Sequence, residues 1–172
     1  MKNKIFYALF VLFFLLTAVL SRTKFEIRKE IIINAPIEQV WQAIIEFENY
    51  KNWNSQLAFL GGKIELNEKI HLRLSVEGAE PYEFMPTVSR IKDTETFSWI
   101  ARTGIPGVFD GEHFFELREI DSGRVLLVNR EEYRGILSLI IEQLPMMKLA
   151  PRGFEKMNTE LKDYIEGAKV KS

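Results

Sequence analysis

The segment from Ile31 to Trp53 constrains the fold more than any other part of the chain. Three consecutive isoleucines at its start are β-branched and favour a strand. Pro36 then suits the first turn of a helix, where its missing N–H costs nothing. Apolar residues recur three and four positions apart between Ile37 and Ile45, which predicts a helix with one apolar face. The segment therefore predicts a strand that leads directly into an amphipathic helix.

Composition narrows the classes of protein that this chain can represent. Its 172 residues suit one domain with a sizeable core and a short appendage. The net charge of −1 gives no global field that would attract nucleic acid or anionic lipid, so we expect no nucleic-acid partner. Cysteine is absent and there are only two histidines, so we expect no disulfide, no metal site and no cofactor. Thirteen phenylalanines and three tryptophans supply enough aromatic surface for the thick apolar wall that an internal cavity needs.

The segment Ile5–Leu20 is apolar throughout apart from Thr17. As a helix it would span about 24 Å, slightly less than the roughly 30 Å core of a bilayer. A small-x-small cleavage site is poorly formed, so we expect an uncleaved anchor that holds the protein at a membrane. Cleavage as a signal peptide, followed by secretion, is the alternative. Residues 1–23 are thus predicted to be an anchor or signal segment and residues 24–169 one domain, with the topology left open.

The chain after Trp53 has the pattern of a succession of strands. Between Ile70 and Val76 apolar and polar residues alternate, which is typical of a half-buried strand and places His71 on the solvent side. Pro86 lies within the next strand and predicts an edge position or a bulge. In chain order the predicted strands are Lys63–Leu66, Ile70–Val76, Glu83–Lys92, Thr96–Arg102, Glu112–Ile120 and Arg124–Tyr133.

The residues beyond Gly135 have a helical pattern. Pro145 and Pro151 interrupt its first half, so the better helix is predicted from Gly153 to Gly167. The apolar stripe of this helix consists of Phe154, Met157, Leu161, Tyr164 and Ile165.

The order of strand, two short helices, six strands and long C-terminal helix resembles the START-like, or SRPBCC, superfamily. The opening with Phe47, Tyr50 and Trp53 resembles it too. The chain is also similar to an uncharacterised polyketide-cyclase-like subgroup in the motifs PTV at 86–88, FSW at 97–99, GVFDGEH at 107–113 and GFxxMN at 153–158. The resemblance implies an α+β helix-grip fold. In that fold a curved antiparallel sheet of about seven strands wraps around the long C-terminal helix, with two short helices after the first strand.

The turn DSG at 121–123 sets the register of the last two predicted strands. With a three-residue loop Ile120 lies opposite Arg124, so the residue numbers of every opposed pair sum to 244. The Cβ atoms of opposed residues lie about 4.5–5.5 Å apart, which is close enough for their side chains to interact. Three opposed pairs then share one mainly apolar face that is expected to point into a cavity: His113–Glu131, Phe115–Asn129 and Leu117–Leu127. The opposite face is predicted to be a solvated mosaic of charge: Glu112, Glu116, Arg118, Arg130, Glu132 and Arg134.

Two interpretations of the His113–Glu131 pair stay open. As functional groups within hydrogen-bonding reach, they would orient a ligand carbonyl or act as an acid–base pair, and they are the catalytic candidates. As a structural pair, they would satisfy each other at the cavity mouth and fix the register, which is the commoner situation. The candidate ligand-binding residues, for several of which core packing is an equally good explanation, are Trp99, His113, Phe115, Leu117, Leu127, Asn129, Glu131, Tyr133 and Met157.

Three functional hypotheses follow from these features. The first is a membrane-tethered binding protein that holds a hydrophobic small molecule or lipid between the sheet and the C-terminal helix. The second is a cyclase-, dehydratase- or hydrolase-like enzyme that uses His113 and Glu131. The third is an interaction protein whose pocket is vestigial. The ligand and the oligomeric state are left open.

Overall fold

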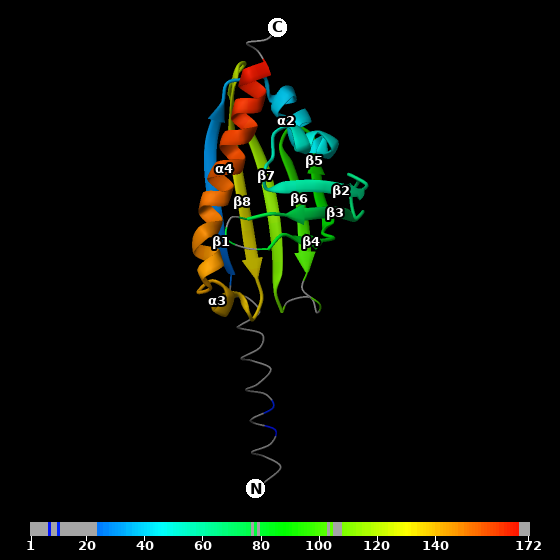
Figure 1. Cartoon of the computed structure of the whole chain (residues 1–172), viewed down its shortest axis with the longest axis vertical. Helices are drawn as coiled ribbons and strands as arrows, with labels where there is room; N and C mark the ends of the chain where they lie inside the picture. The colour runs from blue at the N-terminus through cyan, green and yellow to red at the C-terminus, as the bar shows by residue number, and fades with distance from the viewer. Residues whose placement is uncertain are drawn as a thin grey trace.

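An antiparallel sheet packed on a long C-terminal helix is the main feature of the computed structural model (Figure 1). The structure describes residues 24–168 apart from 77, 79, 103 and 105–107, together with Tyr7 and Phe10. In chain order the described elements are β1 (Lys24–Ile33), α2 (Ile37–Ile45), the 3-10 helix η1 (Phe47–Asn52), β2 (Leu57–Gly62), β3 (Ile70–Leu74), β4 (Tyr82–Phe84), β5 (Thr87–Lys92), β6 (Thr96–Arg102), β7 (Asp110–Asp121), β8 (Arg124–Arg134), α3 (Ser138–Ile141) and α4 (Pro145–Ala168).

The strands form two sheets. The larger has the order β1-β8-β7-β6-β5 and the smaller the order β2-β3-β4, with all neighbours antiparallel. A bridge between Lys69 and Thr87 connects the two sheets beside β3 and β5. Helix α4 runs along β1 and β8, and Figure 1 shows α2 and α3 at opposite ends of the domain. The α+β helix-grip arrangement is therefore present, with eight described strands in two sheets rather than about seven in one.

The predicted first helix is confirmed as α2. Val40, Trp41 and Ile44 are buried on its apolar face, as the three- and four-residue spacing requires. The core continues into η1, where Tyr50 is fully buried and its hydroxyl donates a 2.8 Å hydrogen bond to the carbonyl of Ile44. This bond satisfies a phenol that would otherwise be costly to bury.

The predicted register of the last hairpin is confirmed, but the turn differs. His113 lies opposite Glu131, and the pairs 115–129 and 117–127 are as predicted. Asp121 faces Arg124, so the turn holds two residues rather than three, and a bulge between Glu119 and Asp121 restores the register. The Asp121 carboxylate closes this tighter turn, because it accepts hydrogen bonds from the Gly123 N–H at 3.2 Å and from Arg124 Nε at 2.8 Å.

Two of the strand predictions were wrong. The segment 83–92 is divided into β4 and β5, which belong to different sheets, because Pro86 lacks an N–H and its carbonyl instead accepts from the Ile70 N–H at 3.0 Å. Residues 63–66 form no strand, and the strand β2 lies before them. At Gly62 φ is +106° and an added Cβ would lie 2.4 Å from the carbonyl oxygen of Lys69, so only glycine fits this position in β2.

Helix α4 begins at Pro145, eight residues before the predicted start at Gly153. Pro151 removes one intrahelical hydrogen bond, yet the helix continues through it while packing on β1 and β8. Met157, Leu161 and Ile165 of the predicted stripe are buried, whereas Tyr164 is exposed.

The predicted anchor Ile5–Leu20 lies outside the described residues except for Tyr7 and Phe10. Among the helices of the described part, none combines the length and apolar character needed to cross a membrane. The domain boundary at residue 24 and the anchor therefore stay predictions.

Candidate functional site

A cavity of about 300 Å³ lies between the first half of α4, the end of β8 and the strands β3 and β4. Its wall is mainly apolar and is formed by Leu74, Val76, Met147, Leu149, Ala150, Phe154 and Met157, with Gly78 and Gly153. The polar lining residues are Gln56, Tyr82, Glu131 and Tyr133. An apolar wall with a few convergent polar groups is the usual composition of a small-molecule site.

A larger groove of about 650 Å³ adjoins the cavity. It is more polar, with Ser55, Ser75, Arg152 and Lys156 among its lining residues. The groove and the cavity share Gln56, Val76, Leu149 and Gly153. This shared wall indicates that the groove is the approach to the cavity.

Glu131 is positioned by the register of the large sheet. It lies between His113 on β7 and Ile27 on β1, on the face that carries the cavity. Beside it, Gly111 has no side chain, and an added Cβ there would lie only 2.9 Å from Glu131 Oε1. The glycine therefore leaves the space that the Glu131 carboxylate occupies.

Tyr133 is the hydrogen-bonding neighbour of Glu131 at the cavity wall. Its ring lies between Phe25, at 4.6 Å between centroids, and Phe109, at 5.6 Å. Burial, the negative charge of Glu131 and the hydrogen bond to Glu131 all raise the pKa of the Tyr133 phenol. Burial and the same carboxylate also raise the pKa of Tyr82. Both phenols therefore stay protonated at neutral pH and present an O–H beside a carboxylate.

His113 is held in the aromatic core next to Glu131. Its ring stacks on Trp99 with 4.4 Å between centroids and 5° between planes, and Phe115 meets it edge-on at 4.8 Å. His113 Nδ1 lies 3.8 Å from Glu131 Oε2, so the expected hydrogen bond is not made. The imidazole is therefore held mainly by its contacts with aromatic rings rather than by a hydrogen bond to the carboxylate.

The structure separates the predicted site residues into two layers. Glu131, Tyr133 and Met157 line the cavity. The other members lie on the same side of the sheet but are buried in the core rather than at the cavity wall: Trp99, His113, Phe115, Leu117, Leu127 and Asn129. Phe154 lines the cavity and lies 5.2 Å from His113 between ring centroids, so it connects the cavity wall with the buried histidine. Their functional roles stay predictions.

Sequence reasoning missed a second group of wall residues. Gln56 and Tyr82 lie outside the predicted elements, and Ala150 lies in the part of the helical pattern that the prolines interrupt. It also missed Asn158, which is buried on α4 and accepts a 2.9 Å hydrogen bond from Asn129 Nδ2. Asn158 was marked by the motif GFxxMN at 153–158, and Phe154 both by that motif and by the apolar stripe of the predicted helix.

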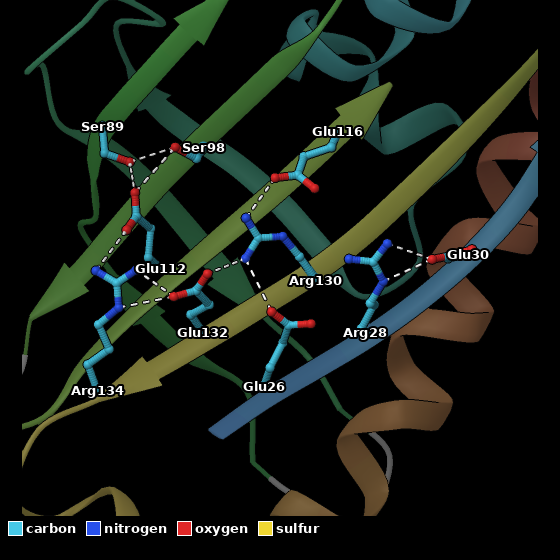
Figure 2. Close-up of polar contacts among 10 residues, drawn as sticks. All are labelled: Glu26, Arg28, Glu30, Ser89, Ser98, Glu112, Glu116, Arg130, Glu132 and Arg134. Atoms are coloured by element: carbon cyan, nitrogen blue, oxygen red, sulfur yellow. Dashed lines mark hydrogen bonds and ion pairs between the residues drawn. The ribbon is translucent and has the colours of Figure 1, made fainter. Parts of the chain in front are cut away.

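The outer face of the large sheet carries the predicted mosaic of charge, organised around Arg130 (Figure 2). Its guanidinium pairs with Glu116 at 2.6 Å, Glu132 at 2.5 Å and Glu26 at 3.4 Å. It also lies over the ring of Phe114, with Cζ 3.9 Å from the centroid. The network is not simply solvated, because the Arg130 side chain is only 12% exposed.

His71 lies on β3, the central strand of the small sheet, and its Nε2 is 2.9 Å from the Glu83 carboxylate, which also accepts from Arg73. Its side chain is partly exposed, close to the solvent position that was predicted. Among the residues that the structure describes, no group of three histidine, aspartate or glutamate side chains is arranged to hold a metal ion.

Comparison with solved structures identifies the fold. A protein of Chromobacterium violaceum aligns with a TM-score of 0.63 and 16% identity, over 82% of this chain and 96% of that one. Norcoclaurine synthase of Thalictrum flavum aligns with a TM-score of 0.60 and 10% identity, over 86% and 89%. The Aha1 dimer of Colwellia psychrerythraea aligns with a TM-score of 0.60 and 18% identity, over 83% and 96%. No family model and no curated protein sequence matches the chain.

These similarities, together with the packing of α4 on β1 and β8, show the helix-grip fold of START-like, or SRPBCC, proteins, as the sequence predicted. At identities below 20% they establish the fold alone. The narrower resemblance to a polyketide-cyclase-like subgroup stays a prediction.

Proposed function

We propose that this domain binds a small, largely apolar molecule that carries a hydrogen-bond donor. The observation that carries the proposal is the cavity of about 300 Å³, whose apolar wall ends at the Glu131–Tyr133 pair. Burial of apolar ligand surface would supply most of the binding free energy, at roughly 25 cal/mol per Å². Glu131, paired with Tyr133, would accept a hydrogen bond from the ligand and set its orientation.

A structural relative supports this class of ligand. The structure of norcoclaurine synthase holds dopamine and hydroxybenzaldehyde, which are small aromatic molecules. The cavity here is of a size that suits molecules of this kind, and its wall includes the aromatic side chains of Phe154, Tyr82 and Tyr133.

The binding interpretation has more support than the two alternatives. An enzyme that uses His113 and Glu131 as an acid–base pair needs both groups at the ligand, but His113 is buried and does not line the cavity, whereas its neighbours Phe154 and Glu131 do. A vestigial pocket is less favoured because the cavity is not filled by side chains.

The proposal includes the membrane tether. The support for it is the apolar run Ile5–Leu20, which has no polar face and is connected to β1 by residues 21–23 alone. Loss of membrane association on deletion of residues 1–20, measured by fractionation of cells, tests this part of the proposal. Retention of the truncated chain in the membrane fraction would contradict it.

Native mass spectrometry of the full-length chain, purified in mild detergent from its own cells, tests ligand binding. We expect an adduct of defined mass on the unaltered protein. Ala150→Phe, which places a ring in the cavity, should remove it. Thr159→Phe is the matched control on the same helix, since Thr159 is exposed and its hydroxyl bonds only the carbonyl of Glu155. An adduct that survives Ala150→Phe, or the absence of any adduct, would contradict the proposal.

A further inference from the structure

Four large apolar side chains are exposed within thirteen positions around α3. Leu137 is 38% exposed, Ile140 65%, Leu144 41% and Leu149 50%. Hydrogen bonds from Ile140 N to Leu137 O and from Leu144 N to Ile141 O hold this segment in tight helical turns. We refer to Leu137, Ile140, Leu144 and Leu149 as the α3 surface. Grouped exposure of this kind marks an interaction site more often than isolated exposed residues do.

The α3 surface lies at the end of the domain where the chain enters β1 (Figure 1). Lys24, the first residue of β1, pairs with Arg134, the last residue of β8. Helix α3 follows almost at once, with a 3.0 Å hydrogen bond from the Ser138 N–H to the Gly135 carbonyl. The start of the domain and the start of α3 are therefore neighbours.

The short connection to the apolar run restricts where this end of the domain can lie. Leu20 and Lys24 are separated by residues 21–23, and four extended steps cover at most about 14 Å. If the run Ile5–Leu20 lies in a bilayer, as the proposed function holds, Lys24 stays within about that distance of the end of the run. The neighbouring α3 surface is then held at the membrane surface.

The charges beside the α3 surface suit a membrane. Lys24, Lys148 and Arg152 are exposed and make no ion pair among the residues that the structure describes. Cations beside exposed apolar side chains are the composition of a segment that lies in the headgroup region of a bilayer with anionic lipids. The acidic residue Glu142 lies in the same segment, and the basic residues outnumber it.

We propose that the α3 surface docks on the lipid bilayer that holds the apolar run. This inference rests on the tether of the proposed function and specifies how the domain sits on the membrane. Leu149 belongs both to the α3 surface and to the walls of the groove and cavity. Docking therefore turns the approach to the cavity toward the membrane, and the ligand would enter from the bilayer.

The absence of cysteine allows a direct test with single labelled sites. Full-length Ile140→Cys, labelled with a nitrobenzoxadiazole fluorophore, is reconstituted into vesicles of phosphatidylcholine and phosphatidylglycerol. Gln42→Cys is the control, because Gln42 is exposed on α2 at the opposite end of the domain. Spin-labelled phosphatidylcholine should quench the label at 140 and leave the label at 42 unaffected. Aqueous iodide should quench the label at 140 at least about threefold less than the label at 42, since a docked side chain sits about 5–10 Å below the surface.

Each alternative outcome has a distinct meaning. Vesicles that carry the protein but leave the label at 140 open to iodide and untouched by the lipid quencher would overturn docking and keep the tether. Protein that fails to float with the vesicles would overturn both, while ligand binding stands on its own mass-spectrometric test. A label at 140 that neither quencher reaches would show that another protein surface, such as a second copy, covers the α3 surface, and this too would overturn docking.

Discussion

Replacement of Arg130 by methionine should destabilise the domain clearly. Arg130 on β8 makes short ion pairs with Glu116 and Glu132 and lies over Phe114 (Figure 2). The hydrogen bond to Glu116 raises the pKa of Arg130, and burial lowers it. The hydrogen bond has the larger effect, so the pKa of Arg130 lies above its ordinary value. Methionine keeps an apolar, unbranched side chain and removes the guanidinium, so the change removes the ion pairs and the contact with the Phe114 ring together.

The expected loss follows from the exposure of the partners. Hydrogen bonds to charged groups contribute about 1.5–3 kcal/mol each when buried, and a cation over an aromatic ring about 0.5–2 kcal/mol. Glu116 is 32% exposed and Glu132 14%, and Glu132 keeps its pair with Arg134. Water can therefore solvate much of the stranded charge, and we expect a loss of about 2–3 kcal/mol, below the 3–5 kcal/mol of a fully buried pair.

Urea denaturation of the full-length chain in mild detergent measures this loss. The three tryptophans of the chain all lie in the domain core, so fluorescence reports its unfolding. With a slope of about 2 kcal/mol per molar urea, the midpoint should fall by roughly 1–1.5 M. Arg28→Met is the control, because within the described residues Arg28 pairs only with Glu30 on β1 and both are nearly half exposed. Its midpoint should fall by less than about 0.5 M. Equal shifts in the two variants would refute the reasoning.

The same experiment has a defined pH dependence. Burial raises the pKa of Glu132, but the hydrogen bonds from Arg134 and Arg130 outweigh it and lower the pKa overall. A carboxylate with a lowered folded-state pKa stabilises the fold above its unfolded pKa of about 4.3, and this stabilisation is lost as the pH falls through the folded value. The difference in the free energy of unfolding between the unaltered chain and Arg130→Met should therefore have its full value at pH 7 and should become smaller below about pH 4.

Two further substitutions test the core and the cavity. Trp41→Ala should lower the free energy of unfolding by about 2–5 kcal/mol, because Trp41 is buried on α2. Gln42→Ala, on the exposed face of the same helix, should change it by less than about 0.5 kcal/mol. Similarly small changes at both positions would contradict the assigned buried face. Gly111→Ala should displace the flexible end of Glu131 and weaken the ligand adduct in native mass spectra, with a loss of stability below about 1 kcal/mol. Gly123→Ala, where an added Cβ meets nothing within 4 Å, is its control, and an adduct unchanged by Gly111→Ala would contradict the role given to Glu131.

Local patterns predicted the parts of the fold that depend on local spacing. The buried face of α2 follows from the helical period, and the pairing of His113 with Glu131 follows from the length of one turn. That pairing was derived with a three-residue loop, whereas the structure has a two-residue turn and a bulge that compensates for it. The division at Pro86 could not be predicted, since a period of two does not say to which sheet a strand belongs.

The cavity wall was less predictable because it depends on contacts between distant segments. Sequence spacing places His113 and Glu131 on one face of the sheet, and the structure confirms this. Whether a residue on that face lines the cavity depends on which side chains of α4 pack against it. Phe154 and Glu131 line the cavity and His113 does not, and no pattern within β7 or β8 carries that information.

The position of the cavity follows from where small residues face large ones. Near α2 the interior is filled by interlocking rings, such as Phe47 against Tyr50 at 4.4 Å and Phe47 against Trp99 at 5.8 Å between centroids. Near α3 the facing positions are Ala150 and Gly153 on α4, which fill little volume, so the same sheet and helix enclose a space there. The space lies at the end of the domain where the chain enters β1. A ligand that left a membrane beneath this end would therefore reach the cavity first, without passing the packed aromatic rings near α2.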